Sequence, residues 1–557
     1  MEFSQLAILL STAAIFGVVS RLLKQPLLIG YLFAGMLLAM TGFLHDNVML
    51  EDLGKIGVTL LLFLLGLEMN LKELPQIGKV ALITGLGQII FTAIIGFVLA
   101  LILGFSSLSA AYISIALTFS STIIIVKLLS EKNDLSTLYG RIAVGFLLIQ
   151  DFVAMILLMF LSGVNGGGLT GADYLLIAIK SISLFIIVWI LSKYVLPKLF
   201  EKVIGNSSEI IFIVSISWAI GVASFVAGPV GFTLEIGGFL AGLALSNLPE
   251  HLQIAARTRP LRDFFLTIFF LYLGTQLVIE QGFLSLLPQV IIFSVFVLIG
   301  NPIIVMILMG LLGYRKRTSF LAGLTVAQIS EFSFVILAIG AGMGHVSQKE
   351  VAIIILVGVI TMTISTYFIL GADKIYKKIS RYLTIFEKRR TKEEALTVEH
   401  DLKEHIVLIG SDRTGKVLTS YFKNRDYPFL VVDFNPVVYN RLTASNIPVI
   451  FGDMNDPDII EAAGIRDARL IVSTVSMLDD NLPLLEYVST LKRKPLTLFT
   501  AATKKDAFKL YDKGATLVIV PEIAAGEHLR HIFDIHGIGE VTLGKLGKSH
   551  FNRLTHL

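Results

Sequence analysis

Thirteen stretches of mostly apolar residues fill the first 373 positions of this 557-residue chain. A helix needs about 20 such residues to cross about 30 Å of hydrocarbon. Charged residues number 38 up to position 373 and 50 in the remaining 184, or about 10% against about 27%. So few charges cannot cover a protein surface in water, so the first part is predicted to lie in a lipid bilayer. The stretches are 6–23, 27–43, 54–69, 78–104, 108–127, 141–163, 173–196, 208–227, 229–246, 263–279, 283–311, 318–342 and 350–373.

Charge in the connecting loops predicts the orientation. If Met1 lies outside, the inner loops carry sixteen Lys and Arg residues and the outer loops only Lys55 and Lys349. Because basic residues stay on the cytoplasmic side, we expect a multi-pass protein of the plasma or inner membrane with a cytoplasmic C-terminal part. The eighth and ninth stretches are separated only by an expected turn at 227–229. The absence of cysteine excludes thiolate chemistry, and a net charge of +4 gives no reason to expect a nucleic-acid partner.

Two pairs of segments repeat at almost the same spacing. Ile29–Gly35 is similar to Ile236–Gly242 at an offset of 207, and Phe63–Gly66 is similar to Leu271–Gly274 at an offset of 208. Seven stretches separate the copies, and an odd number turns the second copy upside down in the membrane. Inverted repeats with interrupted helices near the midplane are typical of secondary transporters.

One acidic residue lies near the middle of the sixth stretch. An ionisable group costs about 2.5–3.5 kcal/mol inside a span, so Asp151 calls for an explanation. Its carboxylate can bind a monovalent cation, K⁺ or Na⁺, or a proton, and Gln150 offers an amide oxygen beside it. The alternative is a structural pair with a neighbouring helix.

Polar residues interrupt the fifth and twelfth stretches, which correspond by the repeat. Broken helices there would direct free carbonyls and helix ends at one point of the membrane. Alternatively, the hydroxyls bond to their own helix four residues back. Glu331 is expected to be either a second proton group or a structural partner of a basic residue. The first cluster is Thr118, Ser120, Ser121 and Thr122; the second is Gln328, Ser330 and Glu331, with Asn301 from the eleventh stretch.

Five motifs together resemble the monovalent cation:proton antiporters, and within them the glutathione-gated potassium-efflux branch. The resemblance covers the whole membrane part. It implies a homodimer of about thirteen spans that moves as an elevator, with crossed fifth and twelfth helices and Asp151 as the exchange site. The motifs are Gln25–Tyr31, Leu62–Glu68, Phe119–Thr122, Gln150–Asp151 and Glu331–Phe334.

Many relatives that move net charge have two adjacent acids where this chain has Gln150-Asp151, and a lysine in the eleventh span, where this chain has none. A single carboxylate favours electroneutral, one-for-one exchange, and the resembling branch favours K⁺ over Na⁺. A Na⁺/H⁺ antiporter and a ligand-gated potassium channel remain alternatives. An enzyme is not expected, because no catalytic set accompanies the glycine loop described below.

The C-terminal part reads as a charged linker over 374–404, an α/β domain over 405–521 and a tail over 522–557 without an interpretable motif. Short apolar runs alternate with helical patterns in the α/β domain, which is typical of a parallel Rossmann-like sheet. The expected strands are 405–410, 428–433, 447–453, 468–475, 496–502 and 515–521.

The first of these strands leads into a loop that nearly matches the dinucleotide fingerprint, and the next ends in Asp433. Asp412 replaces the middle glycine and would crowd a pyrophosphate, so AMP or another adenine nucleotide is favoured over NAD, with an empty pocket as the alternative. Phe451–Asp453, Asp456-Pro457 and Glu461–Ile465 resemble the regulator-of-potassium-conductance domain, which implies a dimeric regulatory module. The expected nucleotide-binding residues are Gly410, Ser411, Asp412, Arg413, Thr414, Gly415, Asp433 and Asp453.

Overall fold

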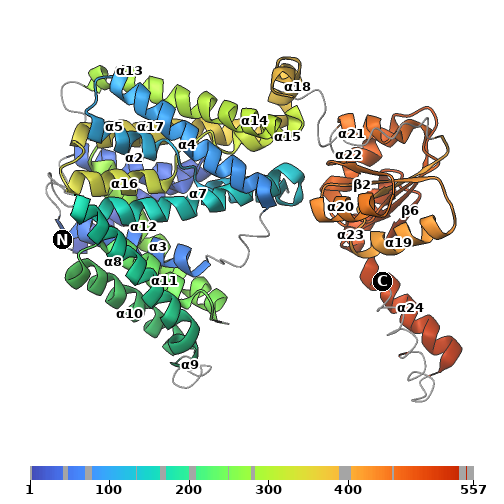
Figure 1. Cartoon of the computed structure of the whole chain (residues 1–557), viewed down its shortest axis with the longest axis horizontal. Coiled ribbons are helices and arrows are strands. Elements are labelled where there is room, and N and C mark those ends of the chain that lie inside the picture. Colours follow the sequence, from blue (N-terminus) through green and yellow to red (C-terminus); the bar gives the residue numbers. More distant parts are fainter. Residues whose placement is uncertain are drawn as a thin grey trace. The chain divides into compact units, whose positions relative to one another are not determined.

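A computed structural model describes residues 3–41, 48–68, 78–132, 134–163, 171–199, 208–248, 250–277, 283–387, 403–454, 457–537 and 547. The chain divides into two compact units. The first comprises 1–135, 139–309 and 319–382, and the second 136–138, 310–318 and 383–557. The first unit is a helical bundle and the second is built on a parallel sheet (Figure 1).

Six helical segments of the described residues are long and apolar enough to cross a membrane, and four shorter apolar helices accompany them. The predicted number of thirteen spans is therefore not confirmed. The helices are α1 (Phe3–Leu22), α2 (Leu27–Met40), α3 (Val48–Glu68), α4 (Gly78–Ile102), α5 (Ser107–Ala116), α6 (Thr122–Glu131), α7 (Leu138–Gly163), α8 (Gly171–Ile190), α9 (Leu196–Leu199), α10 (Ser208–Phe225), α11 (Leu234–Leu245), α12 (His251–Thr275), α13 (Phe283–Val295), α14 (Asn301–Leu311), α15 (Lys316–Leu324), α16 (Glu331–Gly342), α17 (Gln348–Leu370) and α18 (Ala372–Leu383).

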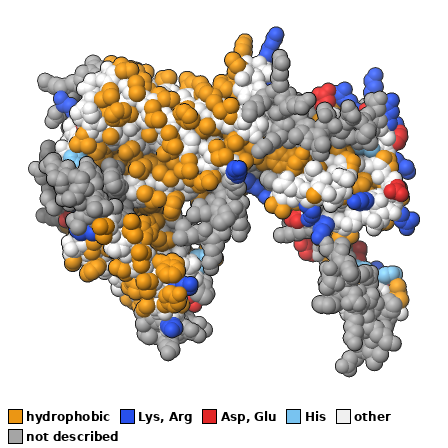
Figure 2. All heavy atoms as spheres, viewed as in Figure 1, with side chains coloured by type: hydrophobic (Ala, Val, Ile, Leu, Met, Phe, Trp, Pro, Cys, Tyr) orange, Lys and Arg blue, Asp and Glu red, His pale blue; other side chains and the backbone are white. Residues whose placement is uncertain are grey.

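Large apolar side chains cover much of the face of the first unit that Figure 2 shows. On α4 alone, Ile90, Phe91 and Ile94 are at least half exposed. A water-soluble monomer rarely exposes so much contiguous apolar surface, whereas a bilayer solvates it. The surface of the bundle therefore agrees with the predicted membrane location.

Helices α1–α3 and α10–α12 pack against one another and are called the scaffold helices here. Glycines allow their backbones to touch: a Cβ on Gly35 would lie 2.0 Å from the carbonyl oxygen of Leu271, and one on Gly242 would lie 1.9 Å from that of Phe63. Gly242 follows Gly35 by 207 residues and Leu271 follows Phe63 by 208, so the two contacts are equivalent under the predicted repeat. The packing of these helices therefore confirms the repeat, while its inversion stays a prediction.

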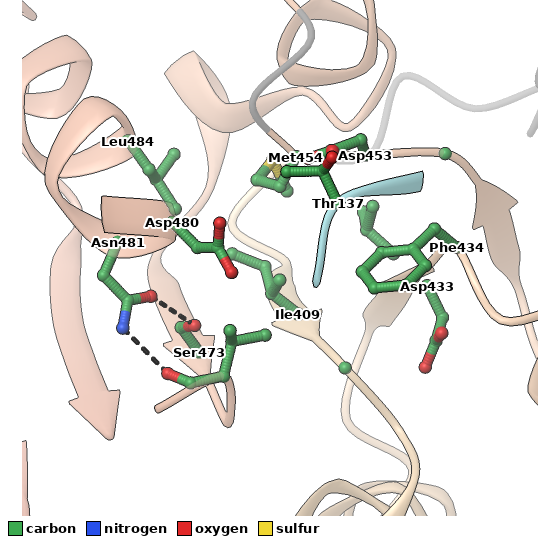
Figure 3. Close-up of a pocket in the computed structure, with 14 residues that line it drawn as sticks. Thr137, Ile409, Asp433, Phe434, Asp453, Met454, Ser473, Asp480, Asn481 and Leu484 are labelled. Carbon is green, nitrogen blue, oxygen red and sulfur yellow. Dashed lines mark hydrogen bonds between the residues drawn. The ribbon is translucent and has the colours of Figure 1, made fainter. Parts of the chain in front are cut away.

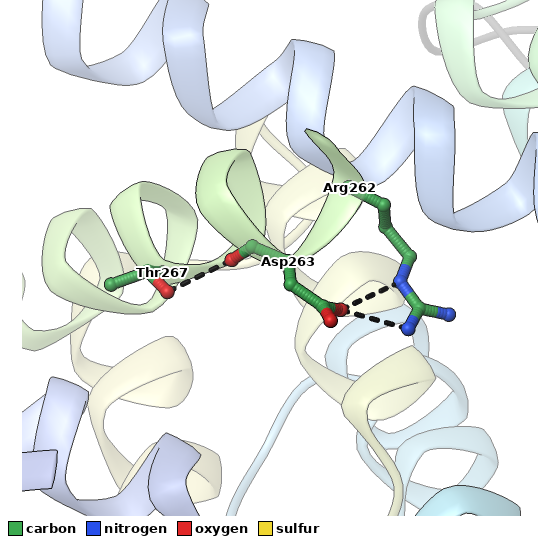
Figure 4. A network of polar contacts seen from close by, with 3 residues as sticks. All are labelled: Arg262, Asp263 and Thr267. Carbon is green, nitrogen blue, oxygen red and sulfur yellow. Dashed lines mark hydrogen bonds and ion pairs between the residues drawn. The ribbon is translucent and has the colours of Figure 1, made fainter. Parts of the chain in front are cut away.

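Two loop predictions for this unit were wrong. Residues 227–229 are not a turn, because a π-helical segment, Val226–Val230, continues α10 and the chain reverses at Gly231, whose φ is +85°. Arg257, Arg259 and Arg262, three of the sixteen basic residues expected in inner loops, lie within α12, because this helix begins at His251, before its apolar part. Figure 4 shows Arg262 paired there with Asp263, whose backbone carbonyl accepts a hydrogen bond of 2.9 Å from the hydroxyl of Thr267.

The described residues of the second unit form six parallel strands in the order β3-β2-β1-β4-β5-β6. This order confirms the predicted Rossmann-like fold, and each strand falls within its predicted range. The strands are β1 (Ile406–Ile409), β2 (Phe429–Asp433), β3 (Val449–Phe451), β4 (Leu470–Ser473), β5 (Leu496–Thr500) and β6 (Leu517–Ile519). The helices are α19 (Arg413–Asn424), α20 (Pro436–Ala444), α21 (Pro457–Ala462), α22 (Leu478–Ser489), α23 (Lys504–Asp512) and α24 (Pro521–His536).

Buried side chains alternate between the two faces of this sheet. Val407 and Ile409 face one apolar cluster, and Ile406 and Leu408 face the other. Helices therefore cover both faces, as a doubly wound parallel sheet requires. The predicted tail is helical at its start, because α24 follows β6 directly.

Candidate functional site

The two predicted interruptions are real breaks in helices. Leu117–Ser121 separates α5 from α6, and Thr325–Ser330 separates α15 from α16. Each second half begins with a serine cap: Ser121 accepts a hydrogen bond from the backbone N–H of Ile124, and Ser330 accepts one from that of Phe332. Each serine side chain accepts a hydrogen bond from a backbone N–H group that has no partner within the helix. This capping is why polar residues interrupt both stretches.

The two breaks contact each other. The hydroxyl of Ser120 donates to the carbonyl of Val326 at 3.4 Å, and the hydroxyl of Ser333 donates to the carbonyl of Ala116. Helices α4–α7 and α13–α17 surround this point and are called the crossing helices here. Four half-helix ends thus meet within one buried region of the bundle.

Asp151 lies on α7 in this region and is only 3% exposed. Its carboxyl group lies beside the hydroxyl of Thr122, the first residue of α6, and close enough to Glu331 for the two negative charges to interact. Among the described residues, the Thr122 hydroxyl forms no hydrogen bond other than this contact with the Asp151 carboxyl group. Glu331 is 6% exposed, begins α16 and accepts a hydrogen bond of 3.3 Å from the Ser330 hydroxyl.

No basic side chain in the described part of the chain forms an ion pair with Asp151 or Glu331. The structural alternatives that the sequence left open for these two acids, pairing with a basic residue, therefore have no support among these residues. Two buried carboxylates with hydroxyl neighbours offer oxygen ligands, which alkali cations and protons both accept.

The other predicted residues divide between the two readings. Thr118 agrees with the alternative in which the hydroxyl bonds to its own helix, because its hydroxyl donates to the carbonyl of Ser114, four residues back, at 2.8 Å. The amide oxygen of Gln328 accepts from Ser365 at 2.7 Å, beside the second break. Asn301 was grouped with this second cluster, but its hydrogen bonds go to Thr92 and to the carbonyl of Leu117, so it belongs to the first break.

Three polar residues at the breaks were missed in the sequence. Gln88 on α4 contacts the first break, Thr92 on the same helix joins Gln88 to Asn301, and Thr361 on α17 accepts a hydrogen bond of 3.4 Å from the N–H of Ile329 at the second. The repeat could have pointed to these residues. Asn301 follows Thr92 by 209 residues and Ile329 follows Ser120 by the same number, so the members of each pair occupy equivalent positions.

A cavity lies between the scaffold helices and the crossing helices. Its wall includes Glu51 and Lys55 of α3, Tyr272 of α12 and Val335 of α16. Lys55 pairs with Glu51 at 2.8 Å. The two groups of helices therefore do not pack tightly along their whole junction.

A second pocket lies at the carboxyl edge of the parallel sheet (Figure 3). Asn481 lies in its wall. The amide oxygen of Asn481 accepts from the Ser473 hydroxyl at 2.6 Å, and its amide nitrogen donates to the carbonyl of Val475 at 2.8 Å. Ligands of doubly wound folds bind at this edge, where the strand order reverses. The lining residues include Ile409, Gly410, Asp433, Phe434, Asp453, Met454, Ser473, Asp480, Asn481 and Leu484.

The loop of this pocket keeps two of the three glycines of the dinucleotide fingerprint, Gly410 and Gly415. Gly410 has a φ of +79°, and a Cβ on Gly415 would lie 2.0 Å from the Gly410 carbonyl oxygen, so both positions require glycine. Asp412 occupies the position before α19 with an exposed side chain, and Thr414 is exposed as well. The side chain of Arg413 and the whole of Asp456 lie outside the described residues.

The Asp433 carboxylate is already engaged. It accepts hydrogen bonds of 2.8 Å from the backbone N–H groups of Ser411 and Asn435. Burial raises the pKa of Asp433, and these two hydrogen bonds oppose that rise. Arg441 donates to the carbonyl of Ser411, which fixes the loop from its other side. Ribose hydroxyls would therefore meet a carboxylate held in place by the loop.

A helical bundle with an internal repeat, in which two broken helices meet beside a buried carboxylate, is typical of secondary transporters. The family model described as sodium/hydrogen exchanger, transmembrane, matches residues 8–370, and the TrkA-N domain model matches residues 406–521. The chain belongs to the sodium/hydrogen exchanger family and carries a TrkA-N domain.

Several proteins are similar to this chain over most of its length. YbaL of Escherichia coli (strain K12) is 25% identical over 96% of this chain and 97% of its own. K(+) efflux antiporter 3, chloroplastic, of Arabidopsis thaliana is 28% identical over 81% of this chain and 62% of its own. K(+) efflux antiporter 5 of the same plant is 30% identical over 63% of each chain.

Proposed function

We propose that this chain exchanges a monovalent cation, K⁺ in preference to Na⁺, for protons across a membrane. The observation that carries the proposal is Asp151, a carboxyl group that is buried beside two broken helices and has no basic partner among the described residues. A proton and a cation compete for such a group because each neutralises the same charge. Gln150, Thr118, Ser120, Ser121 and Thr122 shape the site around it.

The preference for K⁺ is supported by the names of two relatives, which are K(+) efflux antiporters. The proposed stoichiometry is one cation for one proton, because Asp151 has a single negative charge to neutralise. Exchange is then electroneutral. A Na⁺/H⁺ antiporter would use the same group, so ion selectivity is measured separately.

The proposed movement is an elevator in which the crossing helices slide along the scaffold helices. The glycine contacts fix the scaffold helices to one another, whereas the cavity lined by Glu51, Tyr272 and Val335 loosens their junction with the crossing helices. We further propose a homodimer formed by both units, with the N-terminus outside the cell and the Rossmann-like domain in the cytoplasm.

The test uses purified protein in liposomes that contain a pH-sensitive dye. Asp151→Asn is expected to abolish proton flux driven by a K⁺ or Na⁺ gradient, because the amide cannot take up a proton. Asp263→Asn removes an exposed carboxylate from α12 and serves as the matched control, with flux unchanged. Normal flux in Asp151→Asn would reject the mechanism, and large currents that tolerate it would favour a channel.

We propose that an adenine nucleotide such as AMP binds the sheet-edge pocket and regulates exchange. The support is the pair of required glycines, Gly410 and Gly415, and the position of Asp433. Calorimetry on the full chain with AMP, ATP and NAD should give heat with AMP, reduced by Asp433→Asn. No heat with any of the three would leave this pocket without a nucleotide function.

A further inference from the structure

A continuous chain of uncharged polar side chains runs behind the first helix break. The Gln150 amide nitrogen donates to the Gln88 amide oxygen at 2.6 Å, and the Gln88 amide nitrogen donates to the hydroxyl of Thr92 at 3.1 Å. The Thr92 hydroxyl donates to the side-chain oxygen of Asn301 at 2.9 Å. All four side chains are fully buried and come from α4, α7 and α14.

This polar chain bonds to the backbone of the break at three points. The Asn301 amide nitrogen donates to the carbonyl of Leu117 at 3.2 Å, and that of Gln88 donates to the carbonyl of Thr118 at 3.1 Å. The Gln150 amide oxygen accepts from the N–H of Ser120 at 3.2 Å. These backbone groups lose their helical partners where α5 ends, and a buried group without a partner costs about 1–3 kcal/mol.

Each member of this polar chain donates to the next one, from Gln150 through Gln88 and Thr92 to Asn301. Because the Gln150 amide nitrogen faces Gln88, its oxygen must face Ser120, and the next residue on α7 is Asp151. Thr92 uses its one proton on Asn301, which leaves the Asn301 nitrogen for Leu117. Loss of one donor therefore disturbs both its neighbours and the backbone that they hold.

We propose that Gln88, Thr92 and Asn301 are positioning residues that hold the α5–α6 break in the shape that binds the cation. They act through Leu117, Thr118 and Gln150 and do not contact the ion. The inference rests on the proposed exchange at Asp151. None of the three side chains titrates, so the frame keeps its shape over the pH range in which Asp151 gains and loses its proton.

The test compares two buried threonines on α4. Thr92→Val removes the hydroxyl that joins Gln88 to Asn301, whereas Thr84→Val removes a buried hydroxyl without a hydrogen-bond partner. Thr92→Val should raise the apparent KM for the cation about tenfold with a smaller change in maximal rate. Because protons compete with a weakened cation, the acid limb of the pH profile should move to higher pH by about one unit.

Thr84→Val is expected to keep both the KM and the pH profile, and Thr92→Ser, which restores the hydroxyl, should return both toward normal. Should Thr92→Val not be recovered as folded protein, Gln88→Met is measured in the same way. Equal KM values and pH profiles in Thr84→Val and the network variant would overturn the inference while exchange itself stands. Absence of exchange in the unmodified chain would instead reject the proposed function.

Discussion

The scaffold helices and the crossing helices use the same inverted repeat in different ways. In the scaffold, both copies make the same contacts, Gly35 against Leu271 and Gly242 against Phe63. In the crossing helices, the copies share the broken backbone but differ in side chains. A repeat is thus kept strictly where backbones touch, and it diverges where the chemistry of the site is carried out.

The two breaks illustrate this divergence. At equivalent positions, the N–H of Ser120 bonds to Gln150 of α7, and the N–H of Ile329 bonds to Thr361 of α17. The residue after Gln150 is Asp151, whereas Met362 follows Thr361. The broken backbone is present twice, but an acidic residue follows the partner of the N–H group only at the first break.

The largest effect is expected from a methyl group added to the scaffold. Gly242→Ala would place a Cβ 1.9 Å from the carbonyl oxygen of Phe63, so α3 and α11 must separate and little folded protein should be recovered. Gly221→Ala on α10 has open space around its Cβ and is the control. Detergent-solubilised yield and thermal unfolding check this, and equal behaviour of the two variants would contradict close scaffold packing.

A smaller effect is expected from the second acid. Glu331→Gln removes the charge that interacts with Asp151 but keeps the shape of the side chain. If Glu331 adds to the field that attracts the cation, apparent cation affinity should fall about tenfold without loss of exchange. Glu350→Gln, at the exposed start of α17, is the control. Unchanged KM in liposome flux assays would assign Glu331 a structural role at the start of α16.

The smallest effect is expected at the second break. Thr361→Val removes the acceptor for the N–H of Ile329 and should lower the free energy of unfolding by about 1–3 kcal/mol while Asp151 retains its surroundings. Thr363→Val serves as the control, because that hydroxyl bonds only to the carbonyl of Val359 on its own helix. A change in the KM for the cation that, expressed as a free energy, exceeds the change in the free energy of unfolding would show that both breaks contact the ion.

The sequence predicted the features that depend on local pattern and on repeats. The polar runs at 117–122 and 325–331 marked both breaks, and alternating apolar runs marked all six strands. These features follow from rules that act within a few residues, namely caps, hydrophobic periodicity and glycine turns. Asp151 stood out because a carboxylate is costly in hydrocarbon.

The residues that hold the breaks were harder to find. Gln88 and Thr92 on α4 are ordinary polar residues of an apolar helix, and their role depends on Asn301, more than 200 residues away. Asn301 was assigned to the wrong break for the same reason. The sequence also misplaced the start of α12, because the helix continues through charged residues where the apolar pattern stops.

The hydrogen-bonded chain from Gln150 to Asn301 contains no formal charge. A transmembrane voltage does about 2.3 kcal/mol of work on each elementary charge carried across 100 mV. The voltage therefore exerts no net force on this chain of side chains. For the proposed exchange, the charges near the first break on which the voltage acts are therefore those of Asp151, Glu331 and the bound ion.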